Sequence, residues 1–207
     1  MKKIFLSLAV AALVSTTPLV AQNHTCGIDI VAGIVGFDTL KGKVNGQTSK
    51  EWGIEIFPIK IDTYDCFLLN NHLGLYASVG IGPGFCINDT NKSAFQLRFD
   101  FMAGPAFGVD LGESSVRFQI GVPFHAAIIN ATTGNDETSY TVTALGFALT
   151  PQFRFTANKR CSFVLGADLM FDLSADIKPK SGDKYSLDNA FMFSFLPYLG
   201  LGINFGK

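Results

Sequence analysis

The residues best suited to chemistry in this chain are charged side chains set inside strongly apolar segments. The segment 94–107, "AFQLRFDFMAGPAF", places Arg98 and Asp100 among three phenylalanines. Carboxylates and arginines in such a setting could transfer protons, guide a solute, or pair with one another. The choice depends on which way these side chains face, and therefore on the elements that carry them.

A nucleophilic site is not evident. His125 lies in an apolar segment, but position 127, where a hydroxyl two residues away would stand, is Ala127. His24 and His72 lie far from it in the sequence. The four cysteines form no Cys-x-x-Cys pair and lack metal-ligand spacing. The sequence therefore predicts no catalytic residue, no metal site and no cofactor.

The N-terminus has the order of an export signal. Lys2 and Lys3 precede the apolar stretch 4–14, and small residues follow up to Ala21. A stretch this short is typical of a secretory signal peptide and does not span a bilayer. We expect residues 1–21 to be the signal peptide and 22–207 to form a single domain.

The composition favours a membrane protein. Apolar residues make up 48 % of the chain and charged residues only 16 %, against about 25 % charged in ordinary soluble domains. The formal net charge of −1 gives no electrostatic reason to bind nucleic acid. After residue 21 no uninterrupted apolar run reaches the length of a membrane helix. Only helices and closed barrels span lipid, which leaves a barrel or a soluble β protein.

Period-2 alternation, the signature of barrel strands, recurs along the chain. It covers residues 27–37, 51–61, 73–84, 94–109, 116–129, 140–156, 162–173 and 190–205. Polar, turn-rich connections are expected at 38–50, 85–93, 130–139 and 174–189, and short ones at 110–115 and 157–161. The connection 62–72 is longer than this pattern predicts.

One parity of these segments is uniformly bulky and apolar, while the other is small or polar. The charged strand residues share the second parity, and with His125 they are Asp29, Glu55, Arg98, Asp100, Arg117, Arg154, Asp168 and Asp172. An arginine on the lipid face near the midplane costs about 2–4 kcal/mol. We therefore predict that these side chains form a polar network in the lumen.

The segment 51–61 breaks the rule. Its apolar parity switches near Pro58, with Phe57 grouped with Ile59, which predicts a β-bulge. Without a bulge, Lys60 would face lipid. Prolines also interrupt other segments, at Pro83, Pro105, Pro123, Pro151 and Pro197.

The last segment carries a familiar pattern. "YLGLGINF" (198–205) places Gly200 ahead of Ile203 and Phe205. It resembles the C-terminal insertion signal of outer-membrane barrel proteins, although Ile203 is not aromatic and two residues follow Phe205. With the signal peptide and the eight segments, the chain resembles a small outer-membrane β-barrel of the porin-like superfamily.

The resemblance implies an all-β, eight-stranded antiparallel up-and-down transmembrane β-barrel in the cell outer membrane, with its N-terminus on the periplasmic side. It implies outer-membrane lipid and the barrel insertion machinery as partners, and a lumen filled by side chains. Because export permits disulfides, four cysteines allow three complete pairings. If the first two strands are neighbours, Cys26 and Cys66 are the most reachable pair.

Function in such a barrel would come from its loops, from lipid contact or from a site at the rim. Barrel enzymes that deacylate lipid A use a His-x-Ser pair, which Ala127 removes here. We expect a structural or loop-mediated interaction role, with an extracellular or envelope partner, and no enzyme activity. A rim-active lipid-modifying enzyme and a soluble exported barrel that binds an apolar ligand remain the alternatives.

Overall fold

The computed structural model describes most of the chain beyond its N-terminus. The described residues are 23–44, 47–68, 72–88, 93–111, 116–133, 139–158, 160–180 and 185–205. The signal peptide predicted at 1–21 lies outside them, as do the last two residues.

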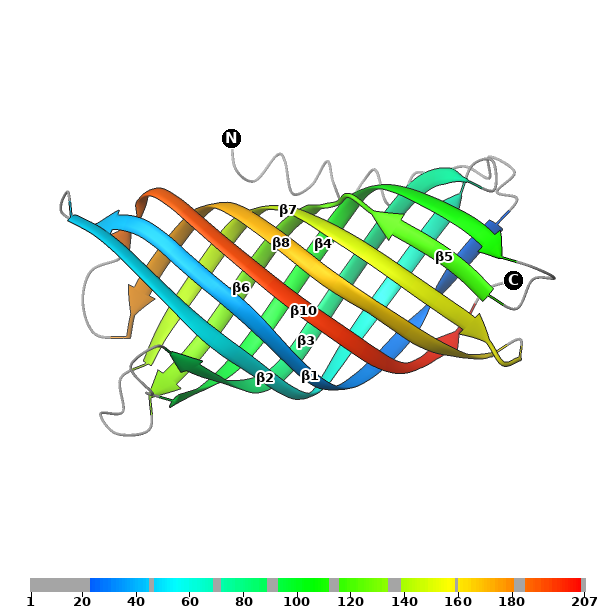
Figure 1. The fold of residues 1–207 in the computed structure, drawn as a ribbon, viewed down its shortest axis with the longest axis horizontal. Helices are drawn as coiled ribbons and strands as arrows, with labels where there is room; N and C mark the ends of the chain where they lie inside the picture. Colours follow the sequence, from blue (N-terminus) through cyan, green and yellow to red (C-terminus); the bar gives the residue numbers. More distant parts are fainter. Residues whose placement is uncertain are drawn as a thin grey trace.

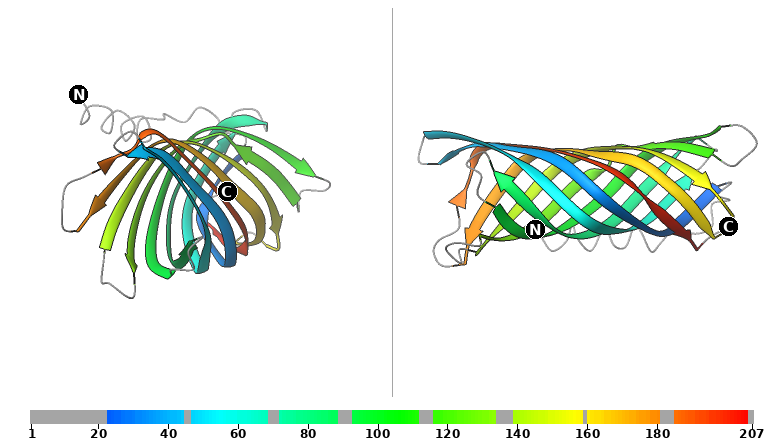
Figure 2. Two further views of the ribbon diagram at one scale, coloured as in Figure 1. Left: turned by 60° about the vertical axis from the view of Figure 1, so that its left-hand side comes forward. Right: turned by 60° about the horizontal axis from the view of Figure 1, so that its bottom comes forward.

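The described chain is a continuous antiparallel sheet that closes on itself (Figures 1 and 2). Its strands are β1 (Asn23–Val44), β2 (Gln47–Leu68), β3 (Leu73–Asn88), β4 (Ser93–Leu111), β5 (Val116–Gly121), β6 (Phe124–Thr133), β7 (Ser139–Thr156), β8 (Cys161–Pro179), β9 (Tyr185–Ser186) and β10 (Asp188–Asn204). Each strand pairs with the next along the barrel wall, and β10 pairs back with β1.

The wall has eight positions, as the sequence predicts. Strands β5 and β6 follow one another and both lie between β4 and β7, so they share one position. The two-residue β9 pairs only with β8, at its edge. The fold is therefore an eight-stranded antiparallel up-and-down β-barrel.

Side chains alternate between the lumen and the exterior along most of each strand. In β4, Phe95 and Phe101 are about half exposed on the outer face, while Arg98 and Asp100 are 1 % exposed. Large apolar side chains cover the exterior on every wall position; they include Ile54, Val79, Phe124, Phe147, Phe163, Leu199 and Leu201. An exterior this apolar would be unstable in water and matches the hydrocarbon core of a bilayer. The barrel therefore spans a membrane, which excludes the soluble barrel.

Among the described residues, no helix has the length and apolar character needed to cross a membrane.

The two ends of the barrel differ. We call the end that carries the β1–β2 connection the hairpin end, and the end where β1 begins and β10 ends the terminal end. The strands β1 and β2 are 22 residues each, although about 9–11 tilted residues suffice to span a bilayer. The two strands remain paired up to Val44 and Gln47, so the prediction of a loop at 38–50 is wrong. Backbone pairing continues beyond the apolar alternation because strand hydrogen bonds do not require lipid around them.

The long connection predicted at 62–72 is also mostly strand. Asp62–Leu68 belongs to β2 and pairs with both β1 and β3. Only four residues separate the end of β2 at Leu68 from the start of β3 at Leu73.

The bulge expected near Pro58 is present. The register of β2 against β3 shifts between Ile56 and Ile61, and both Phe57 and Lys60 point into the lumen. The predicted grouping of Phe57 with the outward Ile59 is wrong, because Phe57 faces the lumen together with the residues before the bulge. β1 has its own shift against β10 between Ala32 and Phe37, which the sequence did not reveal. The two irregularities lie side by side, because β1 and β2 keep their mutual register.

The other prolines lie beside irregularities of the neighbouring strands. On one side Pro83, Pro105 and Pro197 stand in unbroken register opposite Leu97, Leu75 and Ala167. On the other side Pro83 faces the register shift of β2, Pro197 faces that of β1, and Pro105 faces the break between β5 and β6. Pro123 lies at the interruption between β5 and β6, where its carbonyl still accepts a hydrogen bond from Ala148 N–H at 2.9 Å. A proline removes only one donor from a strand, and these positions tolerate the loss.

Candidate functional site

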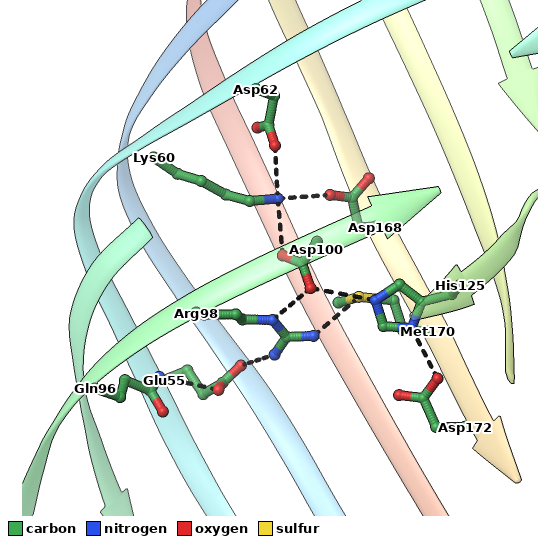
Figure 3. A network of polar contacts seen from close by, with 10 residues as sticks. All are labelled: Glu55, Lys60, Asp62, Gln96, Arg98, Asp100, His125, Asp168, Met170 and Asp172. Atoms are coloured by element: carbon green, nitrogen blue, oxygen red, sulfur yellow. Dashed lines mark hydrogen bonds and ion pairs between the residues drawn. The ribbon is translucent and has the colours of Figure 1, made fainter. Parts of the chain in front are cut away.

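A buried arginine organises the middle of the lumen (Figure 3). Arg98 donates through Nη1 to Glu55 Oε2 at 2.9 Å and through Nε to Asp100 Oδ1 at 2.8 Å. Its Nη2 lies 3.0 Å from the sulfur of Met170. Gln96 Nε2 donates to the other oxygen of Glu55 at 3.0 Å. The guanidinium thus ties β4 to β2 and touches β8.

Lys60 is the second cation of this centre. Its Nζ lies 3.1 Å from Asp62, 3.4 Å from Asp100 and 3.4 Å from Asp168. The side chain is 2 % exposed. Lys60 would face lipid in a strand without a bulge, but here it faces the lumen. The bulge turns it inward, and sequence parity alone placed neither Lys60 nor Asp62 in the lumen. The parity switch at Pro58 was the available signal.

His125 joins two carboxylates. Its Nδ1 lies 2.7 Å from Asp172 Oδ1 and its Nε2 lies 3.2 Å from Asp100 Oδ1. The ring is fully buried, and no serine or cysteine stands in these contacts. His125 therefore has the geometry of a bridge between β4 and β8 and lacks that of a base beside a nucleophile.

A second cluster lies closer to the terminal end. Arg154 donates to both oxygens of Asp29, at 3.0 and 2.6 Å, and to Ser162 at 2.8 Å. Its guanidinium also stacks 4.1 Å from the ring centre of Tyr64, whose hydroxyl donates to Asn204 at 2.7 Å. These contacts join β1, β2, β7, β8 and β10 in one layer.

Arg117 stands apart. Its nearest ion-pair partner among the described residues is Asp110, at 3.8 Å, near the connection between β4 and β5. The structure places Arg154 and Arg117 away from the middle of the lumen. It brings most of the other charged lumen residues together in one group. We call this group the central network, and its eight residues are Glu55, Lys60, Asp62, Arg98, Asp100, His125, Asp168 and Asp172.

Above the central network, the hairpin end of the lumen is hollow. A cavity of about 370 Å³ is lined by Asp38, Leu40, Glu51, Trp52, Gly53, Glu55, Cys86, Gln96, Ile129, Ala131, Tyr140, Val142, Ile177 and Met192. These residues come from all eight wall positions. Glu55 and Gln96 belong to the contacts around Arg98, so the central network is the floor of this cavity. We call it the vestibule.

The disulfide expected between Cys26 and Cys66 is absent, and all four cysteines are free. Although β1 and β2 are neighbours, the register pairs Thr25 with Cys66 and Cys26 with Asp65. This offset by one residue puts the two thiols on opposite faces of the wall. Cys66 is buried in the lumen.

The residues of the C-terminal pattern lie on the closing strand. Gly200 is packed against β1, since an added Cβ would clash with the carbonyl oxygen of Ile30. Ile203 and Phe205 are exposed on the outer face, and Phe205 N–H donates to the carbonyl of Cys26 at 2.8 Å. Within the described part of the chain, no group of His, Cys, Asp and Glu residues is arranged to hold a metal ion.

No protein-family model matches the chain, and no curated protein does. Solved structures do. The outer membrane protein OprG from Pseudomonas aeruginosa is 12 % identical, with 90 % of this chain and 99 % of that chain covered and a TM-score of 0.49. Neisserial surface protein A is 12 % identical, covering 89 % and 100 %, with a TM-score of 0.45.

The outer membrane protease OmpT from Escherichia coli is 8 % identical, covering 90 % and 98 %, with a TM-score of 0.44. The decisive features are in the chain itself: a closed ring of eight wall positions, an apolar exterior and buried charged residues that face the lumen. This protein is a small, eight-stranded, membrane-spanning β-barrel, and its fold is similar to that of small outer-membrane β-barrels.

Proposed function

We propose that this barrel does not conduct solutes and acts in the envelope as a structural protein whose hairpin end faces outward to a partner. The central network carries the proposal. Glu55, Lys60, Arg98 and Asp100 are at most 2 % exposed, and they fill the lumen at the level of the bulge. Barrels of eight strands leave an interior just wide enough for side chains.

The network also supports a structural role. It links β2, β4, β6 and β8, and β2 and β8 are not neighbours in the wall. Its contacts therefore brace opposite sides of the barrel. Removing one partner of a buried ion pair costs about 3–5 kcal/mol, because the other charge stays buried. A solute path through this level would require such pairs to open.

A non-enzymatic role agrees with the position of His125. The ring is enclosed by the lumen and contacts carboxylates of the network. A lipid at the rim or a polypeptide outside the barrel does not reach it. The vestibule above contains no histidine among its lining residues.

The extended hairpin end supports an interaction role. The β1–β2 hairpin carries Lys41, Lys43 and Lys50 with exposed side chains, beyond the part of the wall that the bilayer needs. At the other end, the exposed Ile203 and Phe205 and the packed Gly200 are proposed to be read by the insertion machinery before the ring closes.

Planar-bilayer recording tests the closed lumen. The refolded protein is expected to give no discrete conductance steps. A variant with Glu55→Ala, Lys60→Ala and Arg98→Ala, checked for folding by its heat-dependent gel mobility, is expected to give steps, because it empties the middle of the lumen. An Arg160→Ala protein, altered at an exposed site, is the control and should stay silent. Regular steps from the unaltered protein would refute the proposal.

A further inference from the structure

The vestibule has a composition that selects one kind of ligand. Its charged lining residues are Asp38, Glu51 and Glu55, all acidic, and its remaining lining is largely apolar. We infer that the vestibule binds a small organic cation with an apolar body, of the kind represented by a primary alkylammonium ion. The inference rests on the proposed closed lumen, since the central network forms the floor.

Two of the three carboxylates have no ion-pair partner among the described residues. Glu55 is already paired with Arg98 and Gln96. In the described ranges, neither Asp38 nor Glu51 forms an ion pair, and their cross-strand partners are uncharged: Asp38 faces Gly53 and Ser194, and Glu51 faces Leu40. Asp38 is the partly buried one of the two, and a partly buried carboxylate that forms no ion pair is stabilised by a cationic ligand.

Gly53 makes room for the polar side of this site. An added Cβ at Gly53 would lie 2.8 Å from Asp38 Oδ1 and 3.0 Å from the Cys86 sulfur. The carboxylate of Asp38 and the thiol of Cys86 therefore lie side by side over the glycine, where a larger residue would displace them. Both residues line the vestibule.

The apolar side of the site is a packed surface. Ile129, Val142 and Met192 belong to one buried cluster, against which Leu40, Tyr140 and Ile177 pack. Most of these residues come from β6, β7, β8 and β10, whereas the carboxylates come from β1 and β2. An ammonium group at Asp38 would place an attached alkyl chain along this cluster. The volume of about 370 Å³ lies within the range of about 300–1,000 Å³ of small-molecule sites.

Protection of Cys86 from a thiol reagent measures binding directly. The test protein carries Cys26→Ser, Cys66→Ala and Cys161→Ser, so that Cys86 is its only thiol, and it is placed in lipid nanodiscs. A small uncharged methanethiosulfonate reports the labelling rate with n-octylammonium, n-octanol or octanoate. We expect saturable protection by n-octylammonium, about tenfold weaker protection by n-octanol, and none by octanoate.

Substitutions locate the effect. Asp38→Asn keeps the shape of the side chain and is expected to raise the half-protecting n-octylammonium concentration about tenfold. Asp110→Asn removes a carboxylate at the terminal end and should leave it unchanged.

Equal protection by n-octylammonium and n-octanol, protection by octanoate, or no effect of Asp38→Asn overturns the inference. The bilayer recording is read separately on the same preparation. Silent bilayers without protection refute the vestibule site alone, whereas conductance steps with intact protection refute the closed lumen alone.

Discussion

Asp100 shows how single residues share the cost of burying charge in this barrel. Its carboxylate meets Arg98 at 2.8 Å, His125 at 3.2 Å and Lys60 at 3.4 Å. Three partners from three strands replace the water that a carboxylate would hold outside the protein. Because each partner also serves another acid, the loss of one cation leaves several buried carboxylates without compensation.

Replacing Arg98 tests this dependence. Arg98→Leu removes the charge that faces Glu55 and Asp100, and we expect the free energy of unfolding to fall by about 3–5 kcal/mol. The barrel should still insert, because the apolar exterior is unchanged. Urea unfolding in detergent micelles, followed by gel mobility, gives the midpoint. Arg160→Leu, at an exposed site, is the matched control, and equal midpoints for both proteins would contradict the role assigned to Arg98.

At the scale of elements, the paired irregularities of β1 and β2 decide which residues reach the lumen. Before the shift in β2, Glu55 and Phe57 face inward; after it, Lys60 and Tyr64 do. A strand without the shift would present Lys60 to lipid and turn Ile59 into the lumen. The bulge therefore lets one strand contribute both the anionic Glu55 and the cationic Lys60 to the central network.

Deleting Pro58 tests the bulge. In the structure Pro58 and Ile59 are consecutive outward residues, so the deletion leaves a regularly alternating strand in which Glu55, Phe57 and Lys60 all still face the lumen. We expect this protein to keep its heat-modifiable folded band. In a strand without the bulge, the same deletion would invert one half of β2 and turn a charged side chain toward lipid, at about 2–4 kcal/mol for a basic residue near the midplane. Pro58→Ala keeps the residue count and serves as the folded control. Loss of the band in the deletion protein alone would argue against the bulge.

At the scale of the whole molecule, an even number of wall positions brings the first and last strands together with their ends on one side. The start of β1, the end of β10, the β2–β3 and β4–β5 connections and Cys161 share the terminal end, while the long β1–β2 hairpin and the vestibule share the hairpin end. The orientation proposed above places the terminal end in the periplasm.

Labelling of intact cells checks the orientation. Two single-cysteine proteins are compared, one keeping only the exposed Cys161 and the other carrying only Ser49→Cys in the β1–β2 hairpin. A membrane-impermeant maleimide should label the Ser49→Cys protein on intact cells and the Cys161 protein only after the outer membrane is opened. The reverse pattern would require the barrel to be inverted.

The sequence by itself determined the class of fold and the direction in which most side chains face. Alternation predicts eight strands, and the confinement of Arg98, Asp100 and Asp168 to one parity places them in the lumen, because the penalty for charge in lipid leaves a strong pattern. Parity also indicated the bulge near Pro58. These features depend only on the local period of the chain and on the difference between its two surroundings, lipid outside and a polar lumen inside.

Only the tertiary structure decided how far the strands extend, which charges meet, and how the cysteines face. Strand ends beyond the bilayer carry no apolar alternation, so the hairpin from Asp38 onward read as a loop. The register between strands placed Cys26 and Cys66 on opposite faces and brought Lys60 onto three carboxylates. The vestibule exists for the same reason: residues from all eight wall positions enclose it, and their relative heights follow from the register and stagger of the closed sheet, which no single segment encodes.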